Sequence, residues 1–164
     1  MMEHHHKHDQ RKLTSVETAL EKFLSSVNFK PKIEIISLQN ASSRVLAKDI
    51  LSKIEIPSFD KASMDGFAIK STDTKYATKK NPVFIKVIGK IFAGDAKKKL
   101  IKSGEVVAIA TGSPLPNGAD SVIMIEDVIK YKDKIKIITK IKKQSNIALR
   151  GEEVKKNQLI LKKG

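Results

Sequence analysis

The residues of this sequence best suited to chemistry are a carboxylate and a hydroxyl that each precede a glycine. Asp65 stands before Gly66, and Thr111 stands before Gly112. A carboxylate on an exposed turn can bind Mg²⁺ or position a water molecule, because that ion prefers hard oxygen ligands. Thr111 offers a hydroxyl, and Gly112 lets backbone amides approach a phosphate or another oxyanion closely. The two pairs are therefore candidates for one site that takes an anionic substrate.

The alternative for both pairs is an ordinary turn. Asp-Gly is a turn dipeptide, because glycine accepts positive φ and aspartate bonds to nearby backbone amides. Thr111-Gly112 fits a simple turn as well, and Pro114 and Pro116 stiffen the loop that follows. On the residues alone, both interpretations stay open.

Asp65 lies in an irregular segment, residues 56–69. Pro57 ends a strand-like run, since proline lacks the N–H of a sheet ladder and fixes φ. The residues that follow mix hydroxyl and carboxylate side chains with large apolar ones, namely Ser58, Phe59, Asp60, Ser63, Met64 and Phe67. A segment rich in both kinds is more than a plain linker.

Three segments carry motifs. They are Pro57-Ser58-Phe59-Asp60-Lys61-Ala62-Ser63-Met64-Asp65-Gly66-Phe67-Ala68, then Thr111-Gly112-Ser113-Pro114-Leu115-Pro116-Asn117-Gly118-Ala119-Asp120-Ser121-Val122, and Asn146-Ile147-Ala148-Leu149-Arg150-Gly151-Glu152-Glu153. They resemble Pro-x-Phe-Asp-x-x-x-Met-Asp-Gly-Phe/Tyr-Ala, Thr-Gly-Ala-x-Leu-Pro-x-Gly-Ala-Asp-x-Val and Asn-Ile-Arg-x-x-Gly-Glu-Asp. These are signatures of the MoeA family, the molybdopterin molybdenumtransferases, which the E domain of gephyrin shares. The resemblance covers about residues 14–164.

The resemblance implies roles for individual residues. Asp65 and Thr111 would be catalytic, with Asp65 helping to hold Mg²⁺ or a phosphate and Thr111 contacting the anion. The substrate-binding residues that it implies are Ser63, Met64, Gly66, Gly112, Glu126, Arg150 and Glu153. For Arg150 and Glu153 the sequence departs from the family pattern. The family's arginine after Asn-Ile is replaced by Ala148 here, and the final aspartate of its motif is replaced by Glu153.

The resemblance also implies a reaction and partners. The family enzyme takes adenylylated molybdopterin (molybdopterin-AMP) and molybdate, releases AMP with the help of Mg²⁺, and leaves molybdenum on the dithiolene. A homodimer is implied, together with an adenylyltransferase-type protein that supplies the substrate. The sequence stops at Gly164, where the family continues into a domain that supplies most of the pocket, so this region alone is expected to be inactive.

Composition limits the alternatives. The 164 residues hold no cysteine, 40% are apolar and 30% are charged, and no apolar run is long enough to span a bilayer, which favours a cytoplasmic protein. The net charge of +14 favours a nucleic-acid binder in principle, but the lysines are scattered and aromatic residues are only 5%. Neither nucleic acid nor membrane is therefore an expected partner. A non-catalytic module that dimerises or completes a partner's active site stays open as the alternative.

Helical patterns occupy the first third of the chain. Thr14 and Glu17 form a capping box, and residues 16–27 carry apolar side chains at helical spacing. A short strand is expected at 32–36, followed by a second helix of about three turns that starts at Ser37. Arg44 is either a partner for an acid or a surface residue. Residues 1–12, which hold His4, His5, His6 and His8, are expected to be a disordered tail and not a metal site.

The remainder favours strands. Short apolar or alternating runs occur at 50–56, 83–88, 106–110, 122–125, 128–131 and 135–141, with turn signals between them. The runs 106–110 and 122–125 are expected to be neighbours, and the last two runs form a hairpin. The fold class predicted is α+β, mostly β, with a small bent β domain.

The resemblance implies how the domains are arranged. Residues 13–54 and 147–164 would form an elongated domain I, with residues 55–146 inserted as the β-rich domain II. The C-terminal molybdopterin-binding domain of the family would be absent.

Overall fold

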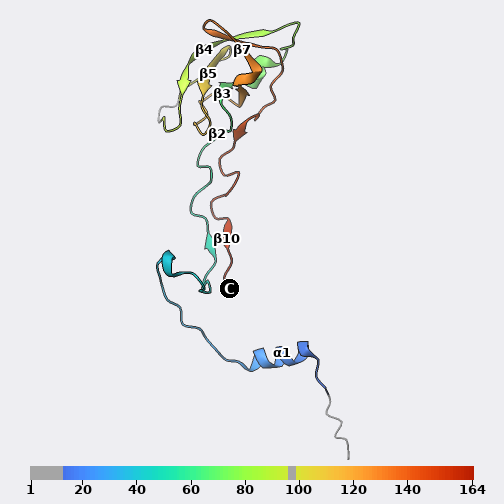
Figure 1. The fold of residues 1–164 in the computed structure, drawn as a ribbon, viewed down its shortest axis with the longest axis vertical. Coiled ribbons are helices and arrows are strands. Elements are labelled where there is room, and N and C mark those ends of the chain that lie inside the picture. Colours follow the sequence, from blue (N-terminus) through green and yellow to red (C-terminus); the bar gives the residue numbers. More distant parts are fainter. Residues whose placement is uncertain (1–12, 96–98) are drawn as a thin grey trace, which may run out of the picture. The chain divides into compact units, whose positions relative to one another are not determined.

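The structure is a computed structural model that describes residues 13–95 and 99–164 (Figure 1). The four histidines therefore lie outside the described residues. Contacts divide the chain into two compact units, with the boundary between Arg44 and Val45. The division into residues 13–54 with 147–164 and 55–146 stays a prediction, and each compact unit is described below by itself.

The described part of the first unit, residues 13–44, contains one α-helix, α1 (Val16–Ser26). Its N-cap is Ser15, whose Oγ accepts a hydrogen bond from the backbone N–H of Thr18 at 3.2 Å. The prediction of Thr14 as the N-cap is therefore wrong by one residue. Ser15 has the extended backbone conformation that an N-cap residue requires. The apolar stripe of this helix is exposed in the described structure, and its members are Val16, Leu20, Phe23 and Leu24.

Two expectations for this unit are wrong. Residues 32–36 form no strand, because no described segment pairs with them, and a strand needs a partner for its N–H and C=O groups. The expected second helix is one 3₁₀ turn, η1 (Leu38–Asn40). Ser43 has φ of 61°, which an α-helix does not accommodate, so no helix of three turns can run through this residue. Arg44 does pair with an acid, since it forms an ion pair with Glu34.

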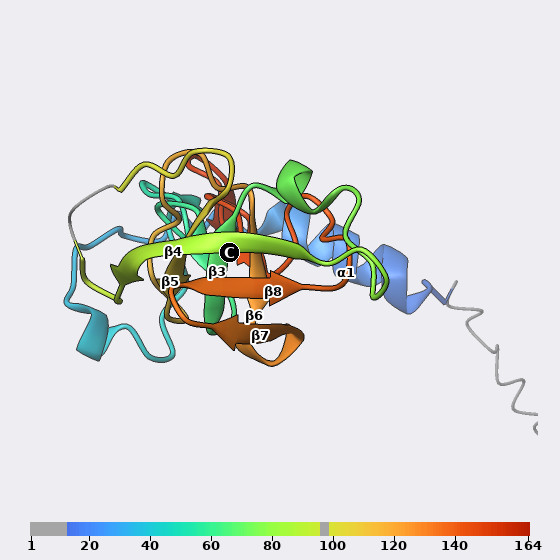
Figure 2. The ribbon, with the colours of Figure 1, turned by 90° about the horizontal axis from the view of Figure 1, so that it is seen from above.

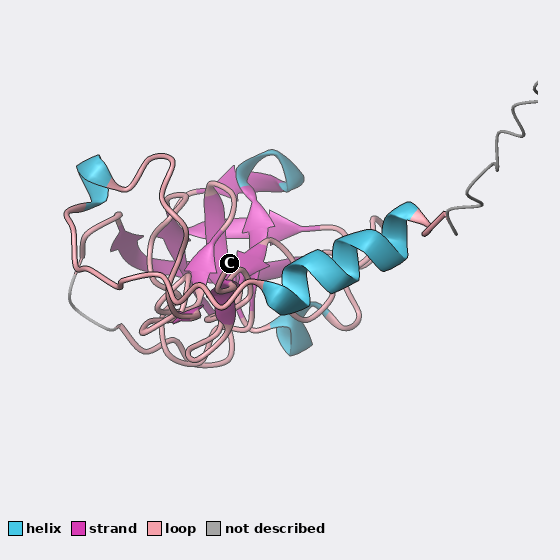
Figure 3. Ribbon diagram, turned by 90° about the horizontal axis from the view of Figure 1, so that it is seen from below, coloured by secondary structure: helices cyan, strands magenta, loops and turns pink. Residues whose placement is uncertain are grey.

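The second unit is built on a six-stranded sheet in the order β6–β3–β5–β4–β8–β7. Figure 2 labels these strands, and Figure 3 shows the strands in magenta. The strands of this sheet are β3 (Gly66–Ile69), β4 (Val83–Ile91), β5 (Glu105–Ile109), β6 (Ser121–Met124), β7 (Val128–Tyr131) and β8 (Lys134–Ile137). All neighbours are antiparallel except β4 and β5. The 3₁₀ turns η2 (Ser71–Thr74) and η3 (Ile125–Asp127) follow β3 and β6. The predicted mostly-β fold class is confirmed.

Strand β3 is the centre of the core. All four of its residues are buried, because both faces of the sheet are covered here. Phe67 and Ile69 pack into a cluster with Ile85, Ile123 and Ile135, among others. Ala68 joins a second cluster on the opposite face, which includes Ile91, Ile101, Val107 and Val122. Because β3 separates β5 from β6, the expectation that runs 106–110 and 122–125 are neighbours is wrong.

Of the remaining strand predictions, the hairpin is confirmed and two others are corrected. The hairpin of β7 and β8 forms around residues 132–133, where Lys132 has φ of 52°. Strand β4 extends beyond the expected run 83–88 and through Gly89, and its register with β5 shifts between Val87 and Lys90. The run 50–56 keeps only β1 (Ile50–Leu51) as a strand.

The two ends of this unit run side by side as a ribbon that leads away from the sheet (Figure 1). Strand β1 pairs with β10 (Leu159–Leu161), and Ile56 bridges to Val154. Closer to the sheet, the N–H of Gly151 donates to Pro57 O at 2.9 Å. The ribbon therefore brings the third motif alongside the first.

The turn after β3 is held by a buried hydroxyl. Thr74 is fully buried, its Oγ1 donates to Ser71 O at 2.8 Å, and it accepts from Ile141 N at 2.9 Å. Asp120 supports the same turn, accepting from the N–H of Ser71 at 2.7 Å and from its hydroxyl at 2.9 Å. The aspartate of the second motif is thus a structural residue that joins β3 to β6.

Replacing Thr74 by valine tests this role. Thr74→Val keeps the shape but leaves the carbonyl of Ser71 and the N–H of Ile141 without their partner. We expect a loss of about 2 kcal/mol in the free energy of unfolding, since unsatisfied buried groups are costly. Urea unfolding measures it, with exposed Thr72→Val as the matched control in the same turn. Equal stability of the two variants would contradict the assignment.

Candidate functional site

The three motif segments lie side by side and are joined by backbone hydrogen bonds. Strand β2 (Lys61–Ala62) is in the middle and pairs with β9 (Ile147–Ala148). On the other side of β2, Gly112 N donates to Ala62 O at 2.8 Å, and Ala62 N donates to Ser113 O at 3.0 Å. Leu115 N donates to Asp60 O at 2.9 Å. Residues 60–65 are therefore fixed on both sides before they reach the carboxylate of Asp65.

Asp65 and Thr111, the two predicted catalytic residues, are in direct contact. The backbone N–H of Thr111 donates to Asp65 Oδ1 at 2.7 Å, and the hydroxyl of Thr111 donates to the same oxygen at 2.6 Å. Asp65 precedes β3 and Thr111 follows β5, so the pairing of these two strands brings the residues together. The structure thus brings together, at one end of strands β3 and β5, two residues that are 46 positions apart in the sequence.

These hydrogen bonds set the charge of Asp65. The bond from the Thr111 hydroxyl, and then the bond from the Thr111 amide, hold the pKa of the Asp65 carboxyl below its ordinary value of 3.8. Because the pKa is lower in the folded state, ionised Asp65 contributes stability above the unfolded pKa. That contribution is lost as the pH falls through the folded pKa. Near neutral pH, Asp65 is an exposed anion.

Asp65 differs from two other aspartates in which of its carboxylate oxygens accept hydrogen bonds. Asp73 accepts from the hydroxyl of Ser103 at Oδ1 and from the N–H of Gly104 at Oδ2. Asp120 likewise uses both oxygens. Asp65 receives both bonds at Oδ1, and no described residue donates to its Oδ2. One oxygen of Asp65 is therefore left to a ligand.

The interpretation of Asp65-Gly66 as a positive-φ turn is wrong. Gly66 opens β3, and its φ is not positive. A Cβ at this position would lie 2.0 Å from the carbonyl oxygen of Ile123, so only glycine allows the two backbones to approach so closely. The glycine therefore serves strand packing beside Asp65.

Gly112 does have the conformation of a turn, with φ of 78°. Its N–H is bonded to Ala62, and the N–H of Thr111 is bonded to Asp65. In this arrangement neither amide is available to an anion. What Gly112 provides is the reversal of the chain after Thr111, with Ser113 N donating to Ala110 O at 3.1 Å.

Three other predicted substrate-binding residues are Ser63 and Met64 of the first motif and Glu126, which follows the second motif. Ser63 and Met64 are exposed on the segment that leads to Asp65. Glu126, on η3, lines a hollow of about 330 Å³ together with Lys79 and Asp127. Neither Asp65 nor Thr111 lines that hollow. Substrate binding by these three residues stays a prediction.

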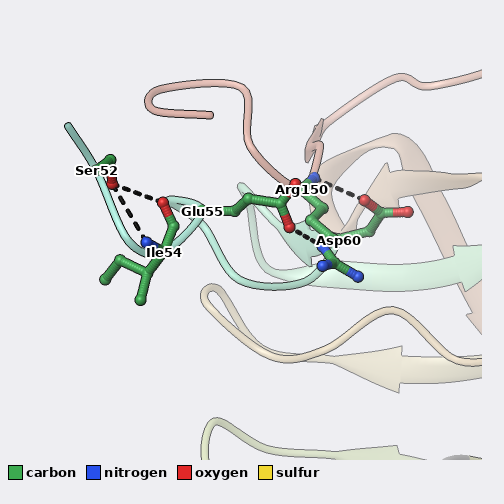
Figure 4. A network of polar contacts seen from close by, with 5 residues as sticks. All are labelled: Ser52, Ile54, Glu55, Asp60 and Arg150. Atoms are coloured by element: carbon green, nitrogen blue, oxygen red, sulfur yellow. Dashed lines mark hydrogen bonds and ion pairs between the residues drawn. The ribbon is translucent and has the colours of Figure 1, made fainter. Parts of the chain in front are cut away.

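The third motif approaches the first through Arg150 and Asp60 (Figure 4). The backbone N–H of Arg150 donates to Asp60 Oδ1 at 2.7 Å, and its guanidinium pairs with Glu55. Glu153 has an exposed side chain, and its N–H donates to Ile56 O at 3.0 Å. The guanidinium of Arg150 is therefore already paired, whereas the carboxylate of Glu153 is accessible.

Asp60 belongs to the irregular segment 56–69, and the sequence predicted no role for it. It accepts from the third motif with its side chain and from the second motif, at Leu115, with its carbonyl. Its place as the aspartate of the first motif, directly before a short strand, was the signal for it. Its partners 55 and 90 residues further along the chain could not be inferred from local sequence.

Two further features of the described residues bear on function. No group of three or more His, Cys, Asp or Glu side chains among them could hold a metal ion. Helix α1 and the shorter turns that the structure describes also lack the length and apolarity of a membrane-spanning helix.

The β-rich unit and its three motif segments define a class of protein, and known proteins resemble the chain over almost its whole length. Residues 14–164 match the family described as "MoeA N-terminal region (domain I and II)", and the chain belongs to this family. The chain is 38% identical over 156 residues to the "Molybdopterin molybdenumtransferase" of Staphylococcus aureus (strain Mu50) and 34% identical over 160 residues to that of Staphylococcus epidermidis (strain ATCC 12228).

Both alignments cover 95% of this chain but only 37% of the relative's length. Among solved structures, a "molybdopterin biosynthesis moeA protein from Pyrococcus horikoshii OT3" superposes with a TM-score of 0.84 at 38% identity. That match covers 93% of this chain and 40% of the other. The chain therefore spans little more than a third of the length of the curated relatives it matches.

Replacing Thr111 tests the cause of the Asp65 pKa. In Thr111→Val the hydroxyl bond is lost and the amide bond stays, so we expect the pKa of Asp65 to rise toward its ordinary value. Thr111→Ser keeps a hydroxyl and should keep the pKa low. A carboxyl-carbon NMR titration measures both. An unchanged pKa in Thr111→Val would show that the amide alone sets the charge.

Proposed function

We propose that this chain supplies the Asp65–Thr111 part of a molybdenumtransferase active site in molybdenum cofactor biosynthesis. The reaction is the insertion of molybdate into adenylylated molybdopterin with release of AMP. Membership of the family and the names of the relatives support this proposal. The observation that carries it in the structure is the accessible Oδ2 of an ionised Asp65, held in place by Thr111.

Asp65 fits the requirements of Mg²⁺ in part. The ion is often bound by one or two carboxylates, with water and substrate phosphates completing its octahedron. Asp65 provides one hard, anionic oxygen that accepts no hydrogen bond from the described residues. When bound there, Mg²⁺ would neutralise charge on the phosphate oxygens of the substrate. The remaining ligands must come from water, substrate or residues outside this region.

Thr111 then acts through Asp65. A hydroxyl has one proton to donate, and here that proton is on the bond to Asp65 Oδ1. Thr111 therefore positions the carboxylate and keeps it ionised, while its lone pairs can still accept from a protonated group. Direct donation to the anion, the role that the family resemblance implies, would require Thr111 to release Asp65.

The whole reaction requires more than this region. The relatives are nearly three times as long as the part aligned with this chain, so we assign the remainder of the pocket to the part that follows in those proteins. A homodimer, in which one subunit's Asp65 site faces the other's pocket, and an adenylyltransferase-type protein that delivers the substrate are the partners we propose.

The test is Asp65→Asn in a full-length transferase that carries this region. Asparagine keeps an acceptor for both Thr111 bonds, so the fold should be kept, and the melting temperature should fall only by the small contribution of the lost charge. The loss of the charge should lower the rate of AMP release on the order of 100-fold, which is typical for removal of one electrostatic group from an active site. AMP release and molybdenum transfer are measured together.

The matched control is Asp73→Asn. Asp73 also accepts from one hydroxyl and one backbone N–H, but it is in η2 and joins that turn to residues 103–104, outside the three motifs. It should leave AMP release unchanged. If Asp65→Asn also keeps full turnover, the chain is better explained as a non-catalytic module that supports a partner's active site.

A further inference from the structure

Strands β4, β8 and β7 present an uncovered face to solvent (Figure 2). Their side chains alternate, so that Ile85, Ile135 and Ile137 are fully buried on one side. On the other side lie six residues that we call the basic face, namely Phe84, Lys86, Ile129, Tyr131, Lys134 and Lys136. The exposed fractions of its large apolar members are 48% for Phe84, 56% for Ile129 and 58% for Tyr131.

The strand register orders the basic face into two rows. Phe84 is paired with Lys136, which is paired with Ile129, and Lys86 is paired with Lys134, which is paired with Tyr131. The rings of Phe84 and Tyr131 meet edge to face, with centroids 6.1 Å apart and planes at 69°. Apolar groups thus lie next to ammonium groups over the width of three strands.

The lysines of the basic face form no ion pair with a described residue. The described ion pairs are those of Arg44 and Arg150, and none between described residues includes a lysine. Glu105 of β5 is opposite Lys86 in the strand register, but its carboxylate accepts from the backbone N–H of Lys102. The basic face therefore keeps an excess of positive charge, with three lysines beside one carboxylate.

We propose that the basic face is a docking surface for an acidic segment of another protein, one that also carries apolar side chains. Carboxylates of the partner segment would lie opposite Lys86, Lys134 and Lys136, because opposite charges attract. Apolar side chains of the same segment would pack against the exposed Phe84, Ile129 and Tyr131. Strand β7 is an edge of the sheet, since it pairs only with β8 among the described strands, so an extended segment has room to lie along it. This interaction is separate from the Asp65 site and goes beyond the reaction proposed above.

Two other occupants fit the basic face less well. A nucleic acid binds through flat stacking on aromatic rings beside cations. Here the two rings pack edge to face against each other, and the face holds no arginine. A second copy of this chain would bring the three lysines of one face close to the three of the other, which is repulsive.

The test is a titration of the ¹⁵N-labelled chain with a synthetic peptide of alternating glutamate and leucine, followed by NMR at ~50 mM salt to limit screening. We expect shifts that map to β4, β7 and β8. The variant Lys86→Gln, Lys134→Gln, Lys136→Gln should bind about tenfold more weakly, as the loss of three exposed charge pairs implies. A peptide with glutamine in place of glutamate should bind as weakly as that variant does to the acidic peptide.

The matched control variant is Lys53→Gln, Lys155→Gln, Lys156→Gln, which removes the same charge from exposed positions off the sheet. It should keep the affinity of the unmodified chain. An equal loss in both triple variants would reduce the effect to net charge and overturn the proposal. So would tighter binding of oligo-dT at this face, concentration-dependent self-association through it, or no binding of the acidic peptide.

Discussion

The hydrogen bonds on both sides of residues 60–65 are the constraint on which the candidate site depends. This short segment has a backbone partner from the second motif on one side and from the third motif on the other. An exposed loop would be free to move, and its carboxylate would have no defined place. With both sides bonded, Asp65 enters β3 at a fixed position, and Thr111, at the end of β5, meets it there.

The buried centre of the sheet supports that arrangement. Strand β3 follows directly from Asp65 and packs against apolar clusters on both faces, so its position is set by burial. Gly66 is required where β3 passes the backbone of β6. Asp120 and Thr74 hold the turn at the other end of β3 through buried polar contacts. Core packing and site geometry therefore rest on the same strand, and damage to one affects the other.

Much of the fold could be predicted from the sequence, and the failures have physical causes. Helix α1, the hairpin of β7 and β8, and β5 follow from local periodicity, which depends on neighbouring residues alone. Strand β3 was missed because it is four residues long and continues a polar loop. The expected strand at 32–36 lacks a pairing partner in the described chain, which periodicity does not reveal. The expected second helix is a single 3₁₀ turn, and the positive φ of Ser43 is incompatible with a helix that continues through this residue.

The candidate site, too, could be predicted only in part from the sequence. Asp65 and Thr111 could be selected by residue type and by motif, because a carboxylate and a hydroxyl next to glycine stand out in any sequence. Their contact, the engaged amides of Gly112 and Thr111, and the part played by Asp60 depend on strand pairing across long stretches of chain. Only the three-dimensional structure shows that the Thr111 hydroxyl is bonded to Asp65.

The most direct test of the account is amide hydrogen exchange of the chain, followed residue by residue with NMR. The N–H groups of Ala62, Ser63, Gly112, Leu115 and Arg150 each donate within the unit formed by the three motif segments. If that unit is one cooperative structure, these five amides should be protected to a similar degree and exchange together. Fast exchange of Arg150 or Leu115 beside slow exchange of Ala62 would contradict the account, because the motifs would then be separate loops.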